Sequence, residues 1–305
     1  MQGDWYFPVR TLVGAGRRHE IRELLNHVCS TPRSISLDPD ASQGNSEIRR
    51  PLVVTDPLVA SLPWFSEFVG VIESGSGGED KWDVQVYSGV HGNPLESDVM
   101  EAAELYRKYN CDSVVCVGGG SGLDAGKCVA MIAESGFETL NHPALDCLHD
   151  GPEVGAIPST GLNQLNRPNR LIPCVAVATT AGTGAEMDSA AMYTNETIGE
   201  KRCAGHRDLP LAVILDAETT LTLPENITAW TGMDALVHAL EALLVPDLYS
   251  PLCDGSALQA LEKIDCNLRS AVVCAREWRD KGMKMKELNN MADQTKDYLH
   301  HLIVR

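Results

Sequence analysis

Two residues whose types can bind a divalent metal stand four positions apart in the last third of the chain. Asp234 and His238 lie in the segment Thr231–Glu241, whose apolar residues recur at helical spacing. Residues four apart face the same side of a helix, one turn from each other, so one cation could bind both side chains. A catalytic metal normally has three or more protein ligands. The adjacent His300 and His301 would point about 100° apart on a helix, so at most one of them could face the same ion. The spacing predicts half of a metal site, and a surface carboxylate beside an ordinary histidine is the alternative.

A glycine-rich turn follows an apolar run earlier in the chain. Residues 113–117 are β-branched and apolar, which is typical of a buried strand, and Gly118–Gly120 lead from them into a helical pattern. A strand, a glycine turn and a helix N-terminus can together present backbone N–H groups to a pyrophosphate. The turn does not match GxGxxG, because Leu123 replaces the last glycine, and Cys128 is one of two departures from the Walker A motif. A purely structural turn is the alternative.

Polar side chains follow two other strand-like runs. After the run at 175–178 comes a turn rich in hydroxyl groups, which could bind phosphate, ribose or a nicotinamide amide through Thr179, Thr180 and Thr183. These threonines could equally cap the next element. Asp56 ends the run at 51–55, where a carboxylate can accept hydrogen bonds from an adenosine ribose and would repel a 2′-phosphate. This favours NAD over NADP, although an N-cap for a helix starting at Pro57 is an equally good reading.

Together these segments resemble the iron-containing, group III metal-dependent alcohol dehydrogenases. The resemblance runs from about Trp5 to about Asn267, and its ordered motifs are Phe7-Pro8, Gly14-Ala-Gly16, Val53–Asp56, Gly89–Pro94, Gly118–Lys127, Thr179–Glu186, Leu209-Pro210, Ile214–Asp216, Leu221–Pro224 and Thr231–Glu241. Gly126 stands where that family more usually has alanine.

The resemblance implies a fold and a set of site residues. The fold is an α/β N-terminal domain with a Rossmann-like parallel sheet, followed by an all-α C-terminal domain. Asp234 and His238 match the first two ligands of the catalytic metal. The positions that match the family's cofactor-binding residues are Asp56, Asn93, Gly119, Gly120, Ser121, Asp124, Thr179, Thr180, Thr183 and Lys201, the last lying just after a strand pair. The family's two further histidine ligands have no counterpart after about Arg276, so the helical domain is expected to be incomplete, which would leave the apolar helix face of Ala235, Leu236, Ala239 and Leu243 exposed.

The implied function is hydride transfer between an alcohol and the nicotinamide of NAD, assisted by Fe²⁺, with Zn²⁺ possible. Two alternatives stay open. One is a catalytically impaired, shortened family member that retains only nucleotide binding. The other is a glycerol-dehydrogenase-like enzyme of the same superfamily. The sequence does not identify the alcohol, the metal or the oligomeric state, although a homo-oligomer is expected for the full-length family.

Composition and patterning bound the remaining expectations. A net charge of −17 disfavours nucleic acid and anionic membranes as partners, and scattered cysteines without a Cys-x-x-Cys pair indicate a reducing compartment. We expect a cytoplasmic location, with mitochondria left open. Strand-like and helix-like segments alternate up to about Pro224, which predicts a dinucleotide-binding domain over 1–220 and a helical metal and substrate domain over 221–305. Polar stretches at 31–50 and 151–170 are expected to form surface loops, the second a lid.

Overall fold

The structure is a computed structural model that describes residues 9–30, 48–74, 80–133, 135, 137–141, 145, 172–205, 209–245 and 251–281. The loops predicted at 31–50 and 151–170, apart from residues 48–50, lie outside these ranges, as do His300 and His301. The chain forms two compact units. The first comprises residues 1–11, 19–177 and 185–214, and the second comprises 12–18, 178–184 and 215–305. The division is discontinuous, whereas the sequence predicted a single boundary after residue 220.

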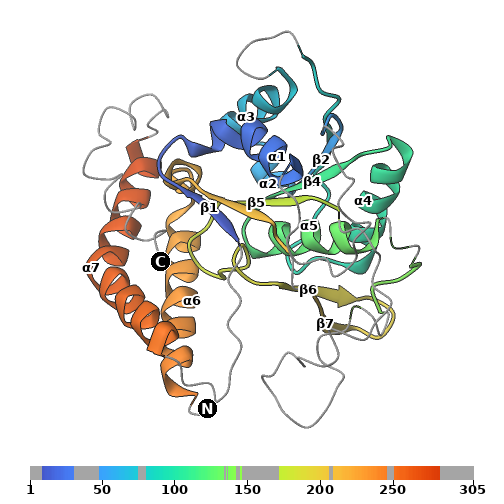
Figure 1. Ribbon diagram of the computed structural model, residues 1–305. Coiled ribbons are helices and arrows are strands. Elements are labelled where there is room, and N and C mark those ends of the chain that lie inside the picture. Colours follow the sequence, from blue (N-terminus) through green and yellow to red (C-terminus); the bar gives the residue numbers. More distant parts are fainter. Residues whose placement is uncertain are drawn as a thin grey trace. The chain divides into compact units, whose positions relative to one another are not determined.

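A six-stranded sheet is the centre of the first unit (Figure 1). Its strand order is β1-β8-β5-β4-β2-β3, with the bounds Arg10–Val13 for β1, Ala212–Leu215 for β8, Cys174–Ala178 for β5, Ser113–Gly118 for β4, Pro51–Val54 for β2 and Gln85–Tyr87 for β3. Strand β2 pairs in parallel with both β3 and β4. The predicted α/β fold with a Rossmann-like parallel sheet, followed by a helical region, is therefore confirmed.

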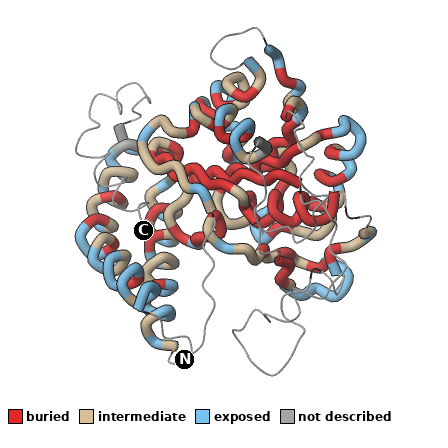
Figure 2. Tube along the Cα trace, viewed as in Figure 1, coloured by how far each residue is buried: buried red, intermediate tan, exposed pale blue. Residues whose placement is uncertain are grey.

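The central strands are buried along their whole length, as Figure 2 shows by the red tubes through the sheet. Continuous apolar runs such as Val114–Val117 and Val175–Ala178 have no solvent-facing side, because helices cover both faces of a parallel sheet. Cys116 and Cys174 are free, buried thiols in these runs. Reduced thiols in such positions pack as small apolar side chains.

Helices of the first unit connect successive strands. They are α1 (Ile21–Ser30), α2 (Pro57–Ala60), α3 (Pro63–Ser74), α4 (Glu96–Lys108) and α5 (Gly120–Ile132). The 3-10 turn η1 (Arg17–Glu20) has residues in both units. A hairpin of β6 (Ala190–Asn195) and β7 (Glu200–Gly205) forms a separate antiparallel pair, and α5 packs on β6. Lys201 therefore lies inside the second strand of this hairpin, not after it as the sequence predicted.

Two helices dominate the described part of the second unit after the 3-10 turn η4 (Ala217–Thr220). They are α6 (Glu225–Leu244) and α7 (Pro251–Lys281), which pack against each other. Gly232 allows this close approach. A Cβ there would overlap the Leu268 Cδ1 and would lie 3.0 Å from its Cδ2 and 3.1 Å from its Cγ. Neither they nor the other described helices are long and apolar enough to cross a membrane.

The prediction of which face of α6 is exposed is wrong. Ala239 is buried, and Ala235, Leu236 and Leu243 are only partly exposed. The apolar residues that face solvent are instead a stripe with alternating three- and four-residue spacing: Trp230, Met233, Val237, Leu240 and Leu244. The sequence could not distinguish the two faces, because α6 is apolar around most of its circumference and its packing partner decides which side is covered.

Candidate cofactor and metal sites

Asp56 lies where β2 ends and α2 begins, in the first unit. Its Oδ1 accepts a hydrogen bond from the Val59 N–H at 2.9 Å and so caps α2. Its Oδ2 lies on the side of Gly118, since a Cβ on that glycine would stand 3.5 Å from this oxygen. The carboxylate is thus both the helix cap and a neighbour of the glycine turn, so the two interpretations of the sequence are compatible.

The glycine turn joins β4 to α5 as the sequence predicted. Gly118 has φ +155°, and a Cβ there would lie 3.2 Å from the Gly122 Cα. At Gly122 a Cβ would stand 2.9 Å from the Val117 carbonyl oxygen. Gly119 is the N-cap of α5 and Gly120 is the first residue of the helix. The glycines therefore let the turn close tightly over the end of the strand, and the helix N-terminus can attract an anion.

Three predicted cofactor residues from distant parts of the sequence meet beside this turn. The Asn93 N–H donates to the Ser121 Oγ at 3.1 Å, and the Lys201 Nζ donates to the Asn93 Oδ1 at 3.3 Å. Asn93 has φ +57°, a conformation that asparagine tolerates better than most residues. The hairpin reaches this segment through a Thr194 N–H to Pro94 O hydrogen bond of 2.7 Å. The structure therefore brings Asn93, Ser121 and Lys201 together.

Asp124 points into the protein, where it holds a buried lysine. One carboxylate oxygen lies 3.0 Å from the Lys127 Nζ, and the other accepts from the Met192 N–H at 3.1 Å. Lys127 is fully buried and donates to the carbonyl oxygens of Ala185, Asp188 and Ala190. Asp124 therefore joins α5 to the β6 hairpin.

The pKa values of this pair follow from their burial. Burial raises the pKa of Asp124 despite the neighbouring ammonium group. Burial alone would lower the pKa of Lys127, but the Asp124 carboxylate outweighs it, and the pKa is raised. The lysine is therefore held in its charged form, and sequence reasoning missed it because a lysine in an amphipathic helix is usually exposed.

Gly126 brings α5 into close contact with β4. A Cβ at this position would overlap the Cβ of Cys116 and stand 3.1 Å from its Cα. The glycine that replaces the family's usual alanine is thus fitted to the side chain on the facing strand.

The three predicted threonines belong to the second unit, in the turn after β5. Thr179 is buried, Thr180 is half-buried and Thr183 is exposed. Gly182 packs this turn on α6: a Cβ there would lie 2.8 Å from the Thr231 Cβ and 2.9 Å from its carbonyl oxygen. Since Thr231 precedes Asp234 by three residues, the threonine turn lies against the helical turn that carries the first predicted metal ligand.

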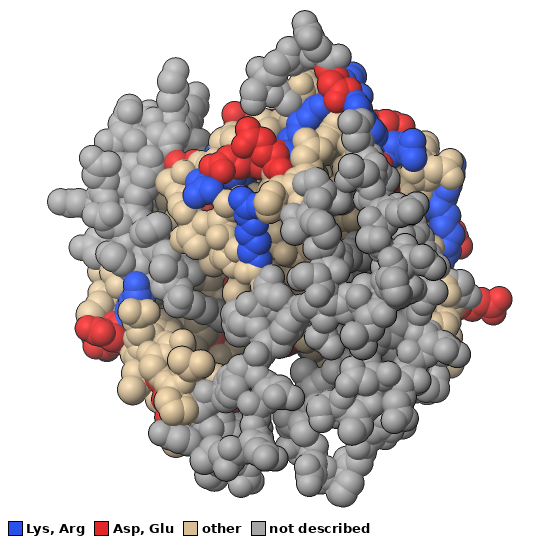
Figure 3. Space-filling model, in the orientation of Figure 1, with Lys and Arg blue, Asp and Glu red and all other residues tan. Residues whose placement is uncertain are grey.

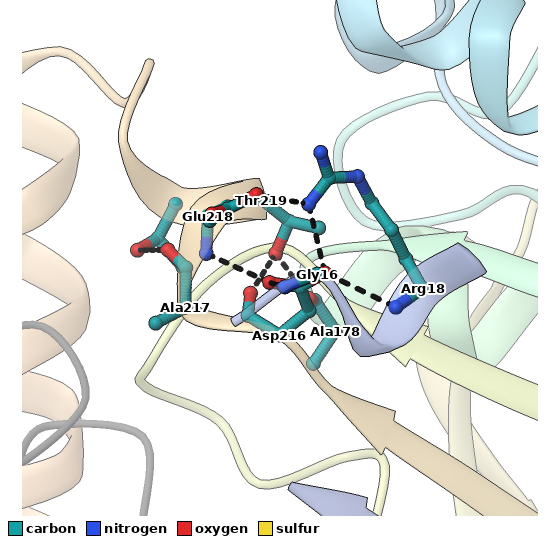
Figure 4. A network of polar contacts seen from close by, with 8 residues as sticks. Gly16, Arg18, Ala178, Asp216, Ala217, Glu218 and Thr219 are labelled. Atoms are coloured by element: carbon teal, nitrogen blue, oxygen red, sulfur yellow. Dashed lines mark hydrogen bonds and ion pairs between the residues drawn. The ribbon is translucent and has the colours of Figure 1, made fainter. Parts of the chain in front are cut away.

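A buried carboxylate network holds this unit together, and its labelled residues converge on Asp216 in Figure 4. The fully buried Asp216 accepts from the N–H groups of Gly16, Arg18 and Glu218 at 3.0–3.1 Å and from the Arg18 guanidinium at 2.8 Å. The Thr219 hydroxyl donates to the Ala178 carbonyl oxygen at 2.8 Å. The motifs around Gly16 and Asp216 thus hold the three segments of the second unit together through hydrogen bonds. The sequence did not reveal this structural role.

Asp234 and His238 lie one turn apart on α6, as the spacing predicted. The Asp234 Oδ1 and the His238 Nε2 are 3.7 Å apart, and their side chains are 42% and 45% exposed. Both donor types suit iron(II) and zinc, and side chains at this separation can turn toward one ion. Within the described ranges, no third histidine, cysteine or acidic residue completes a metal-binding group.

A parallel sheet with a glycine turn and helix N-terminus at its carboxyl edge is the architecture of a dinucleotide-binding α/β protein. A model of the family "Iron-containing alcohol dehydrogenase" matches residues 39–217, and the chain belongs to this family. It is 32% identical over 248 residues to alcohol dehydrogenase 4 of Schizosaccharomyces pombe, which covers 81% of the chain and 51% of that protein. It is 37% identical over 211 residues to 1,3-propanediol dehydrogenase of Citrobacter freundii, covering 69% and 48%.

Solved structures agree with this assignment. The alcohol dehydrogenase from Oenococcus oeni has a TM-score of 0.72 and 27% identity, over 98% of this chain and 64% of that one. The chain spans about half the length of the curated relatives that it matches.

Proposed function

We propose that this chain binds NAD in preference to NADP and takes part in metal-assisted hydride transfer between a small alcohol and the nicotinamide. The observation that carries the proposal is the cluster at the carboxyl edge of the sheet, where Asp56 flanks the glycine turn and Asn93 is held between Ser121 and Lys201. Family membership supports the reaction class.

The preference for NAD rests on the charge of Asp56. Its second oxygen, which does not cap α2, is the one on the side of the glycine turn. A carboxylate so placed can accept hydrogen bonds from ribose hydroxyls and repels a 2′-phosphate. On the face in Figure 3, Lys and Arg atoms and Asp and Glu atoms of the described residues lie among one another in the upper part of the view.

The chain's own residues would bind and orient the reactants. The turn at Gly118–Gly122 would take the pyrophosphate, and the turn of Thr179, Thr180 and Thr183 lies against α6 through Gly182. Asp234 and His238 would hold Fe²⁺ or Zn²⁺ together with ligands from outside the described residues. When bound, the metal supplies Lewis-acid polarisation of the substrate oxygen, and NAD supplies the hydride acceptor.

The test of cofactor choice is a calorimetric titration of the protein with NAD and with NADP. We expect NAD to bind more tightly, and Asp56→Ser to narrow the difference by about tenfold or more because the like-charge repulsion is gone. Serine is also a good N-cap, so α2 keeps its cap and the charge is the main change. Equal affinities in the unaltered protein would contradict the assignment of Asp56.

The test of the reaction is NAD-linked oxidation of a panel of short alcohols, measured together with bound iron and zinc. Turnover that depends on Asp234 and His238 supports the proposal. Tight NAD binding without metal or turnover would favour the alternative of a chain that retains only nucleotide binding.

A further inference from the structure

His91 stands two residues before Asn93, within the Gly89–Pro94 motif, and is not among the cofactor-binding residues that the resemblance implies. The His91 ring Nδ1 lies 2.8 Å from the Asp98 Oδ1, and the ring is otherwise in solvent, with its side chain 67% exposed. The partner carboxylate is 4% exposed. A buried carboxylate thus fixes the orientation of an exposed imidazole.

The backbone around this pair is fixed independently of the ring. Asp98 accepts from the N–H groups of His91 and Leu95, each at 3.0 Å, with its Oδ2. It therefore caps the start of α4 with one oxygen and orients the imidazole with the other. Since the cap does not use the ring, removal of the ring leaves the helix start intact, and a binding role can be separated from a structural one.

His91 lies in the same group of loops as the proposed nucleotide site. The Thr55 N–H donates to the Tyr87 carbonyl oxygen at 2.9 Å, and the Val90 N–H returns to the Thr55 carbonyl oxygen at 3.4 Å. These bonds place the two loops side by side, with Asp56 following one and His91 following the other. Two residues after His91, Asn93 binds Ser121 and Lys201.

The charged side chains around His91 are mainly carboxylates. Asp98 and Glu101 face it from α4, and Glu196 faces it from the β6–β7 turn, where its Oε2 accepts from the Ser97 N–H at 3.0 Å. Glu101 also accepts from the Tyr87 hydroxyl at 3.0 Å. The hydrogen bond that the ring donates to Asp98 is the main reason why the pKa of His91 is raised. A dinucleotide is an anion, so these carboxylates would repel it. A proton on His91 adds a positive charge that offsets this repulsion.

We propose that His91 is a further nucleotide-binding residue, which contacts the anionic dinucleotide through its protonated ring, and that Asp98 is the residue that positions it. This inference rests on the proposed function, because it assigns a contact within the same nucleotide site. It makes the affinity for the dinucleotide depend on pH: the protonated ring attracts the ligand, and binding in turn stabilises the proton.

The experiment uses ADP-ribose as the probe, with NAD in parallel, in calorimetric titrations from about pH 6 to about pH 9. ADP-ribose carries the adenosine and pyrophosphate but no nicotinamide, so neither metal nor turnover enters the measurement. We expect the unaltered protein to bind ADP-ribose about fivefold more tightly near pH 6 than near pH 9. One added charge pair near a protein surface would give an effect of this size. High salt should reduce this ratio, because the ring is exposed.

Three variants test whether His91 causes the pH dependence of the affinity. His91→Gln should bind at all pH values as weakly as the unaltered protein does near pH 9, and His91→Lys should keep the tighter affinity throughout, because its charge does not titrate in this range. Asp98→Asn should move the midpoint of the dependence to lower pH. The matched control is His19→Gln, which removes another exposed histidine, in η1, and should leave the profile unchanged.

The outcomes separate this inference from the proposed function. If neither ADP-ribose nor NAD binds at any pH, the proposed nucleotide site itself is wrong. If both bind but His91→Gln shows the same profile as the unaltered protein, the role of His91 is overturned while the site stands. A loss of affinity that is equal at every pH would also overturn it, since the proton would then have no part.

Discussion

The proposed nucleotide site of the first unit and the proposed metal half-site of the second are built in different ways. Asn93, Ser121 and Lys201 come from positions far apart in the sequence and meet through side-chain hydrogen bonds at one edge of a sheet. Asp234 and His238 come from a single helix and meet through its periodicity alone. The first arrangement is rigid because several elements over-determine it, whereas the second is half-exposed and has few partners. Substitutions at the contacts that hold the first arrangement should therefore cost more stability than a substitution at the second.

The largest effect is expected at the buried pair of Asp124 and Lys127, which joins α5 to the β6 hairpin. Lys127→Met should lower the free energy of unfolding by about 3–5 kcal/mol, because it leaves the Asp124 carboxylate buried without its partner. Adding Asp124→Asn should restore part of this loss. Urea unfolding monitored by circular dichroism measures both. Since the pKa of Lys127 is raised, its contribution should be full below about pH 10 and decline as pH rises further.

A smaller loss is expected where α5 meets β4. Gly126→Ala should cost about 1–3 kcal/mol of stability, because the added methyl group overlaps the Cys116 Cβ. A double-mutant cycle tests the cause: Cys116→Gly should relieve the cost, whereas Cys116→Ala, which keeps the Cβ, should not. Gly70→Ala in α3 is the control, since nothing lies within 4 Å of a Cβ there. If both glycines tolerate alanine equally, the packing argument fails.

The contact between the threonine turn and α6 should give a comparable or smaller effect within the second unit. Gly182→Ala should cost about 1–2 kcal/mol, because the methyl group would press on the backbone of Thr231 rather than on a movable side chain. Gly255→Ala in α7, where a Cβ meets open space, should instead stabilise by a few tenths of a kcal/mol or more, as alanine does in helices. Thermal unfolding of the two variants compares them directly.

The smallest effect on stability is expected at the metal half-site. Asp234→Asn should change the free energy of unfolding by no more than about 0.5 kcal/mol without added metal, because the pair with His238 is exposed and 3.7 Å apart. The same measurement with added Zn²⁺ sharpens the comparison. A metal-dependent rise in the midpoint that this variant abolishes would show that the two residues bind the ion. A large loss without metal would mean that this region is as rigid as the nucleotide site.

Local pattern was enough to predict the elements that carry the sites. The β-branched run at 113–117 and the helical repeat after it became β4 and α5, because strand and helix periodicities are set by near neighbours in the chain. The same holds for the placement of Asp234 and His238 on one side of α6, and for Asp56 at the end of β2. The resemblance in ordered motifs then gave the family, which the comparison with known relatives confirms.

What only the tertiary structure decided depends on contacts between residues that are distant in sequence. The burial of Lys127 among three carbonyl groups, the fit of Gly126 to Cys116, and the convergence of Gly16 and Arg18 on Asp216 all join segments that no window of sequence contains. The side of α6 that faces solvent was predicted wrongly for the same reason. A nearly all-apolar helix has no periodic signal to orient it, so the packing of α7, with Gly232 against Leu268, chose the face. The sequence by itself determined which residues could do chemistry and on which elements they stand, because those properties are local. Folding decided which of them meet and which are buried, because those properties depend on the partners that the chain brings together.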